Sequence, residues 1–123
     1  MSKPGGQITF EDHLAYTDSL HQKMLLELRR RVLALDRRIK ETVTPGNRIA
    51  YGLGQIFVEV KVQRSTLKIH FRDGVFRDPE KRIQAIPKSH GWGPLKNRFD
   101  IEKPEDTDYA MRLIEAAFRS LKP

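Results

Sequence analysis

The stretch from Gln55 to Arg72 limits the fold more than any other part of the chain, because apolar and polar residues alternate along it in two runs. Alternation with a period of two indicates β-strands with one apolar face, and the break at 63–66 indicates a β-hairpin. A turn at this break pairs Val62 with Leu67, Val60 with Ile69 and Val58 with Phe71. Since every inward pair is apolar, the pattern also fixes the register. Arg64-Ser65 lacks the Asn or Gly of a primed turn, so we expect a type I based loop.

Helices are predicted on both sides of this hairpin. Ser19 with Gln22 forms a capping box, which indicates a helix from Leu20 to about Leu35. Its apolar stripe consists of Met24, Leu25, Leu28, Val32 and Leu35. The last helix begins near Pro104, and its stripe consists of Ala110, Leu113, Ile114, Ala117, Phe118 and Leu121. Thr9 can cap a short additional helix that carries Phe10.

Further strands are expected around the hairpin. Residues 48–53 form a strand after the turn at 45–47, residues 42–44 form a short extended piece, and residues 99–101 form a short last strand. Asp78 followed by Pro79 predicts a short helix that ends before Pro87. The expected fold is α+β, with an antiparallel β-sheet, a meander of three strands plus a short fourth, packed on one face by the long N-terminal helix and the C-terminal helix.

The length and composition predict one domain and a cytoplasmic location. We expect residues 1–8 to be a flexible leader and residues 9–123 to form a single α+β domain. No apolar run approaches the ~18 residues that span a membrane, and the first residues lack the apolar segment of a signal peptide. The absence of cysteine removes disulfides and thiolate metal sites, and the four histidines lack zinc-binding spacing. We therefore expect no metal and no cofactor.

Two leucines of the long helix fall outside its apolar stripe. Leu26 and Leu33 lie one heptad apart on the opposite side of the helix. One interpretation is that the N-terminal segment packs Phe10 or Tyr16 over them. The other is that they form the face of a homodimer.

The outward side of the hairpin is the first candidate binding surface. The net charge of +7 favours polyanionic partners. In the predicted register Lys61 opposes Lys68, Glu59 opposes His70 and Phe57 opposes Arg72. Like charges in directly opposed positions destabilise a sheet slightly, so a bound anion would offset that cost. The alternative is that an exposed lysine pair needs no ligand.

A glycine-rich loop is the second candidate. In His90-Gly91-Trp92-Gly93 the glycines allow backbone amides to approach a ligand, and Trp92 offers a stacking surface. The alternative is that Trp92 closes the sheet edge or the end of the core. No nucleophile elbow, Walker or dinucleotide motif is present, and the carboxylates show no acid/base pairing, so nothing in the sequence specifies catalysis.

From His21 to Leu121 the chain resembles a bacterial domain of unknown function that is labelled a predicted transport protein and has a YdhG-like fold. The matching stretches are LRRRVLALDRRIKETVTP, RIAYGLGQIFVEVKVQRSTLKIHF, DPEKR, the loop from His90 to Gly93, and TDYAMRLIEAAF. The resemblance implies an α+β fold, and it implies a domain found alone or attached to larger proteins, including some that look like DNA-restriction systems. The family's compact HWGNGD-like run is replaced here by HGWGPLKN.

These observations predict a non-enzymatic binding or accessory module for a phosphorylated partner, either nucleic acid or a nucleotide. Its candidate ligand-binding residues are Lys61, Lys68, His70, Arg72, His90 and Trp92. The alternative is a small-ligand-binding protein or weak enzyme with a pocket at the His90/Trp92 loop. A dimerising structural protein that uses Leu26 and Leu33 is the third interpretation.

Overall fold

The computed structural model describes residues 8–87, 89 and 93–121. The helices are α1 (Phe10–Tyr16), α2 (Ser19–Leu33) and α3 (Glu105–Arg119). The strands are β1 (Lys40–Thr44), β2 (Arg48–Leu53), β3 (Gln55–Val62), β4 (Leu67–Arg72), β5 (Gln84–Ala85) and β6 (Leu95–Ile101). The strands form one six-stranded sheet in the order β1-β2-β3-β4-β6-β5, and every neighbouring pair is antiparallel. The α+β class is confirmed.

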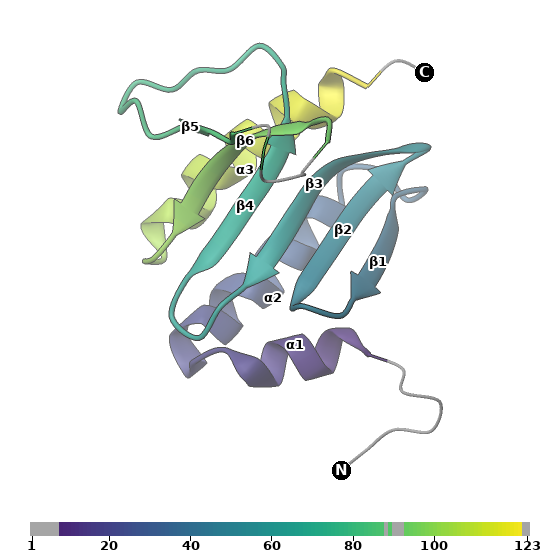
Figure 1. The fold of residues 1–123 in the computed structure, drawn as a ribbon, viewed down its shortest axis with the longest axis vertical. Coiled ribbons are helices and arrows are strands. Elements are labelled where there is room, and N and C mark those ends of the chain that lie inside the picture. The colour runs from purple at the N-terminus through teal and green to yellow at the C-terminus, as the bar shows by residue number, and fades with distance from the viewer. Residues whose placement is uncertain (1–7, 88, 90–92, 122–123) are drawn as a thin grey trace.

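The helices and the sheet form two layers (Figure 1). Helices α2 and α3 lie behind the sheet, and α1 crosses its lower end. The face of the sheet that is turned toward the viewer is covered by no helix of the described chain. None of the helices described is both long enough and apolar enough to cross a bilayer.

The central hairpin has the predicted register. Val62 pairs with Leu67, Val60 with Ile69 and Val58 with Phe71, and all six side chains are at most 1% exposed. In the turn, the Gln63 amide donates to the Thr66 carbonyl at 2.9 Å, and no residue of 63–66 has a positive φ. The turn is therefore not a primed one, as the Arg-Ser sequence indicates.

A β-bulge in β3 changes the faces of two residues. Tyr51 pairs with Val58 and Gly52 pairs with Ile56, so Phe57 is an extra residue opposite β2. Phe57 is completely buried and makes an edge-to-face contact with Phe118 of α3, with ring centroids 5.2 Å apart. The prediction that Phe57 faces outward opposite Arg72 is wrong, because strict alternation cannot include an extra residue.

The prediction of four strands is also wrong. Strand β1 has five paired residues, and β6 extends over seven residues rather than the expected three. The helix predicted after Asp78 does not form. Instead the Asp78 carboxylate accepts hydrogen bonds from the amides of Arg82 and Ile83, at 2.8 and 2.9 Å, and Lys81 has φ of 52°. This side-chain turn competes with the helix and leads into the two-residue strand β5.

The start of α2 differs from its prediction by one residue. Ser19 lies inside the helix, and Asp18 is the N-cap, whose carboxylate accepts from the His21 amide at 2.8 Å. The Gln22 side chain donates to the Thr17 carbonyl rather than completing a capping box. At α1 the predicted cap is confirmed, because the Thr9 hydroxyl accepts from the Asp12 amide.

A partly buried polar cluster joins α2 to the β1 side of the sheet. Arg29 donates from two nitrogens to the two oxygens of Glu41, at 2.8 and 2.9 Å, and the Tyr51 hydroxyl donates to the same carboxylate at 2.8 Å. The Arg29 guanidinium also lies 4.0 Å from the centre of the Phe10 ring. One arginine therefore connects both N-terminal helices to β1 and β2.

Leu26 and Leu33 have different surroundings. Leu33 packs against the hydrophobic core, whereas Leu26 remains 46% exposed. The N-terminal segment therefore does not cover both of them. A homodimer through Leu26 and Leu33 stays a prediction.

The bulge predicts losses of stability of very different size at two adjacent residues. Phe57→Ala should lower the free energy of unfolding by about 3–5 kcal/mol, because a fully buried aromatic side chain is lost. Ile56→Ala, the matched control, should lower it by less than about 1 kcal/mol, because Ile56 is 43% exposed. Urea unfolding of both variants measures this, and a larger loss at Ile56 would contradict the bulge.

Candidate nucleic-acid interface

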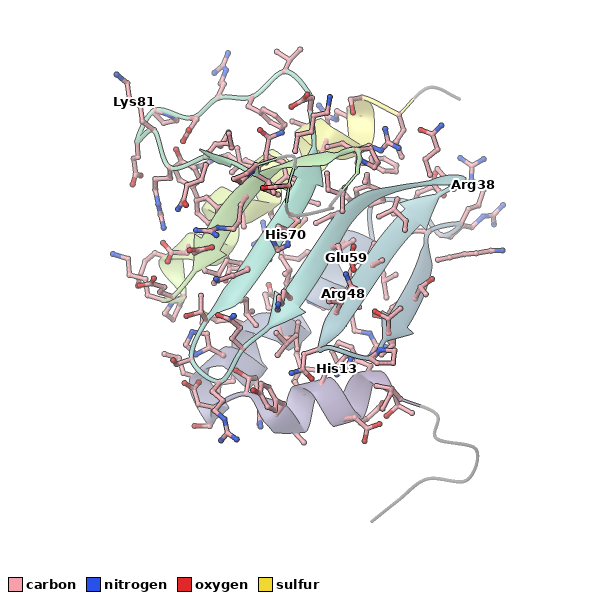
Figure 2. All side chains as sticks on the ribbon, viewed as in Figure 1. His13, Arg38, Arg48, Glu59, His70 and Lys81 are labelled. Atoms are coloured by element: carbon pink, nitrogen blue, oxygen red, sulfur yellow. The ribbon has the colours of Figure 1, made fainter. Side chains whose placement is uncertain are left out.

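The register of the sheet gathers cationic side chains on the face without helices. Directly opposed residues and residues two apart share a face, so pairing places whole rows there. One row runs Thr44, Arg48, Lys61, Lys68 and Asp100, the next runs Thr42, Ala50, Glu59, His70 and Arg98, and the third contains Lys40, Gly52, Ile56 and Arg72. We call this surface the basic face. Figure 2 labels Glu59 and His70, which are directly opposed on β3 and β4, and Arg48 below them on β2.

The basic face carries more positive than negative charge. Its cationic side chains are Lys40, Arg48, Lys61, Lys68, Arg72 and Arg98, and its carboxylates are Glu59 and Asp100. Both carboxylates form ion pairs with arginines of the same face. Arg48 lies 3.6 Å from Glu59, and Arg98 lies 3.2 Å from Asp100. The excess charge is therefore carried by Lys40, Lys61, Lys68 and Arg72.

Lys61 and Lys68 are the pair that the sequence predicts, and the structure places them directly opposite each other. Directly opposed residues have Cβ atoms about 4.5–5.5 Å apart. Among the residues that the structure describes, no carboxylate lies within 4.0 Å of either ammonium group. Both side chains are half-buried. The pair is therefore a local concentration of positive charge without an ion pair in the described part of the chain, and the nearest carboxylate in the register is Asp100, opposite Lys68 on β6.

His70 lies on the basic face as predicted, but it is only 4% exposed. Burial, followed by the nearby charges of Arg98, Lys61 and Lys68, lowers the pKa of His70 to about 4. The imidazole is therefore neutral at pH 7. The charges of Arg98, Lys61 and Lys68 add to the larger effect of burial.

Glu59 is the acidic residue between these groups. Burial raises the pKa of Glu59, and the charge of Arg48 acts in the opposite direction. The carboxylate lies opposite both Ala50 and His70 in the register. It breaks the row of positive charge and separates the lysine pair from the third row.

Arg72 has a structural partner. Its Nε donates to the Ile56 carbonyl at 2.7 Å, next to the bulge. The residue therefore belongs to the predicted surface and also joins β4 to the irregular part of β3. Its charge adds to the basic face, while part of its hydrogen-bonding capacity is used within the fold.

Three cations of this surface are absent from the sequence prediction. Arg48 lies beside Lys61 on β2, Lys40 lies on β1, and Arg98 pairs with His70 from β6. The sequence could have indicated the face of Arg48, because Arg48 lies two residues from Ala50 on the same strand and therefore shares its face. The position of Arg98 could not be inferred, because it depends on pairing between strands far apart in the sequence.

The remaining predicted site residues, His90 and Trp92, lie outside the described residues. The expectation that their loop binds a ligand therefore stays a prediction. Within residues 8–87, 89 and 93–121, no group of three or more His, Asp or Glu side chains is arranged to hold a metal ion.

No protein-family model, curated protein or solved structure matches this chain. The resemblance to the predicted transport protein domain therefore stays a prediction based on the quoted stretches.

The buried imidazole predicts a pH-dependent contribution to stability. In the unfolded chain His70 has an ordinary pKa near 6.5, so between pH 6.5 and pH 4 the unfolded state binds the extra proton. The contribution is therefore present above pH 6.5 and is lost as the pH falls, by about 3 kcal/mol in total. Urea unfolding of the wild type and His70→Gln at pH 7 and pH 4 isolates this difference. Equal losses in both proteins would contradict it.

Proposed function

We propose that the protein is a non-enzymatic binding module for a phosphorylated polymer, most simply a nucleic acid, and that the basic face is its contact surface. The observation that carries this proposal is the opposed pair Lys61 and Lys68, for which the described chain provides no carboxylate partner. Phosphate groups are the counterions that such a pair accepts in a polyanion.

The arrangement of neighbouring cations supports a polymer rather than a single small anion. Arg48, Lys61 and Lys68 occupy adjacent strands in one row. Neighbouring strands are about 4.8 Å apart, so this row presents three positive groups over about 10 Å. A backbone with repeated phosphates can contact such a row at more than one point. Sequence-independent contacts of this kind supply affinity and orientation rather than base specificity.

The lysine pair predicts how binding depends on salt. Each phosphate neutralised by the protein contributes about 0.7–0.9 to the slope of log affinity against log salt concentration. Lys61→Gln/Lys68→Gln should therefore weaken binding and reduce the slope by about 1.4–1.8, if each lysine neutralises one phosphate. Fluorescence anisotropy with labelled single-stranded and duplex oligonucleotides at low and near-physiological salt measures both quantities.

A matched charge control is available on the helix side of the sheet. Arg112 and Arg119 are exposed residues of α3, so Arg112→Gln/Arg119→Gln removes the same charge from another surface. This variant should retain the wild-type slope. If both double variants lose affinity equally, the basic face is not the contact surface. If the wild type binds no oligonucleotide at low salt, the proposed function is wrong.

The pKa of His70 provides an independent signal that phosphate is bound near Lys61 and Lys68. A phosphate near Lys61 and Lys68 neutralises two of the charges that lower the pKa of His70, so binding should raise this pKa toward its ordinary value. NMR titration of the imidazole with and without a saturating oligonucleotide measures the change. Lys61→Gln/Lys68→Gln should raise the pKa without any ligand. An unchanged pKa in the complex would place the bound phosphates elsewhere.

A further inference from the structure

A shallow hollow lies at one end of the basic face, where β1, β2 and β3 approach the turn at Gly54. Its volume is about 380 Å³. It is lined by Lys40, Thr42, Gly52, Gln55 and Ile56, among others. Arg38 stands at its rim, at the opposite end of the sheet from His13 (Figure 2).

The fold produces this hollow through two local features. The first is a floor of small residues, because Ala50 and Gly52 follow each other on this face of β2. A Cβ atom on Gly52 would lie 2.9 Å from the Gln55 carbonyl oxygen, so the close turn of the chain favours glycine there. The second is the bulge at Phe57, which brings Ile56 onto the basic face and leaves it 43% exposed.

The chemistry of the lining matches a planar ring with a polar edge. Ile56 and the glycine floor offer apolar contact, while the Thr42 hydroxyl and the Gln55 amide can each donate and accept hydrogen bonds. Lys40 adds positive charge at the side, and its side chain is exposed. An apolar surface bordered by cations favours an uncharged ring that is attached to phosphate.

We propose that this hollow receives one unstacked base of a single-stranded nucleic acid whose phosphates contact Lys61 and Lys68. The proposal rests on the function proposed above and narrows it to single strands. In a duplex the bases are paired and stacked, so none can enter the hollow without being flipped out.

The spacing between the two sites fits a short oligonucleotide. Gly52 lies four residues from Arg48 along β2, and Arg48 is the neighbour of Lys61. At about 3.3 Å per residue this separation is about 13 Å. A strand that keeps the duplex spacing of about 3.4 Å per nucleotide would connect the hollow with the lysine pair through about four nucleotides, and a more extended strand would need fewer.

The test compares two strands with equal phosphate counts. One is a single-stranded octamer of thymidine, and the other is the same octamer with every base replaced by an abasic tetrahydrofuran unit. The full-length wild type should bind the base-bearing strand about fivefold or more tightly in fluorescence anisotropy at low salt, a factor equivalent to about 1 kcal/mol. Ile56→Ala should remove this preference, whereas Val75→Ala, at another exposed aliphatic residue, should retain it.

A second substitution separates the base contact from the phosphate contacts. Ile56→Lys should strengthen binding of the abasic strand through its added charge and still abolish the preference for bases. If the wild type binds both strands equally, with a salt dependence that requires Lys61 and Lys68, the base site is wrong and the proposed function stands. If neither strand binds but a duplex does, the base site is wrong and the proposed function stands. If no oligonucleotide binds at low salt, both proposals fail. A preference that survives both Ile56 substitutions also overturns the base site.

Discussion

The antiparallel pairing of β3 with β4 is the constraint on which the other features depend. Its helix-facing side buries six apolar side chains, and burial of one such side chain stabilises the fold by about 1.5–3 kcal/mol. Directly opposed like charges cost less than about 1 kcal/mol per pair. The core therefore determines the register, and the register places Lys61 opposite Lys68 whether or not a ligand is present.

The helices keep the β1 side of this sheet in place through a polar connection. Arg29 of α2 binds Glu41 of β1, and Tyr51 of β2 donates to the same carboxylate. Phe10 of α1 packs against the Arg29 guanidinium. Partly buried ion pairs contribute little net stability, since desolvation offsets the attraction, but loss of one partner leaves an unpaired charge. Because β1 and β2 also form the floor and side of the hollow, this cluster positions the surface on the other side of the same strands.

The sequence predicted the parts of the fold that have strong periodicity. The hairpin register and the apolar stripe of α3 agree with the structure, because each follows a regular pattern over many residues. The bulge was missed, although two adjacent apolar residues, Phe57 and Val58, were its signal. Strand β5 has only two residues, which is too short to show the alternation of apolar and polar residues that indicates a strand. On the candidate site, Lys61, Lys68, His70 and Arg72 followed from local register, whereas Lys40 and Arg98 required the pairing of β1 and β6.

The bulge also determines how much β3 can change in length. Phe57 has no partner of its own on β2, since Tyr51 and Gly52 already pair with Val58 and Ile56. Deletion of this residue would leave the other β3 residues on their present faces, at the expense of the contact with Phe118. Deletion of Glu59 or Val60 would shift the register of β3 by one residue on one side of the deletion. The core side chains in that part of the strand would then lie on the basic face, and the outward side chains would lie in the core. Within β3, position 57 is therefore the place where one residue can be deleted while the remaining residues stay on the core face or the basic face as they are now.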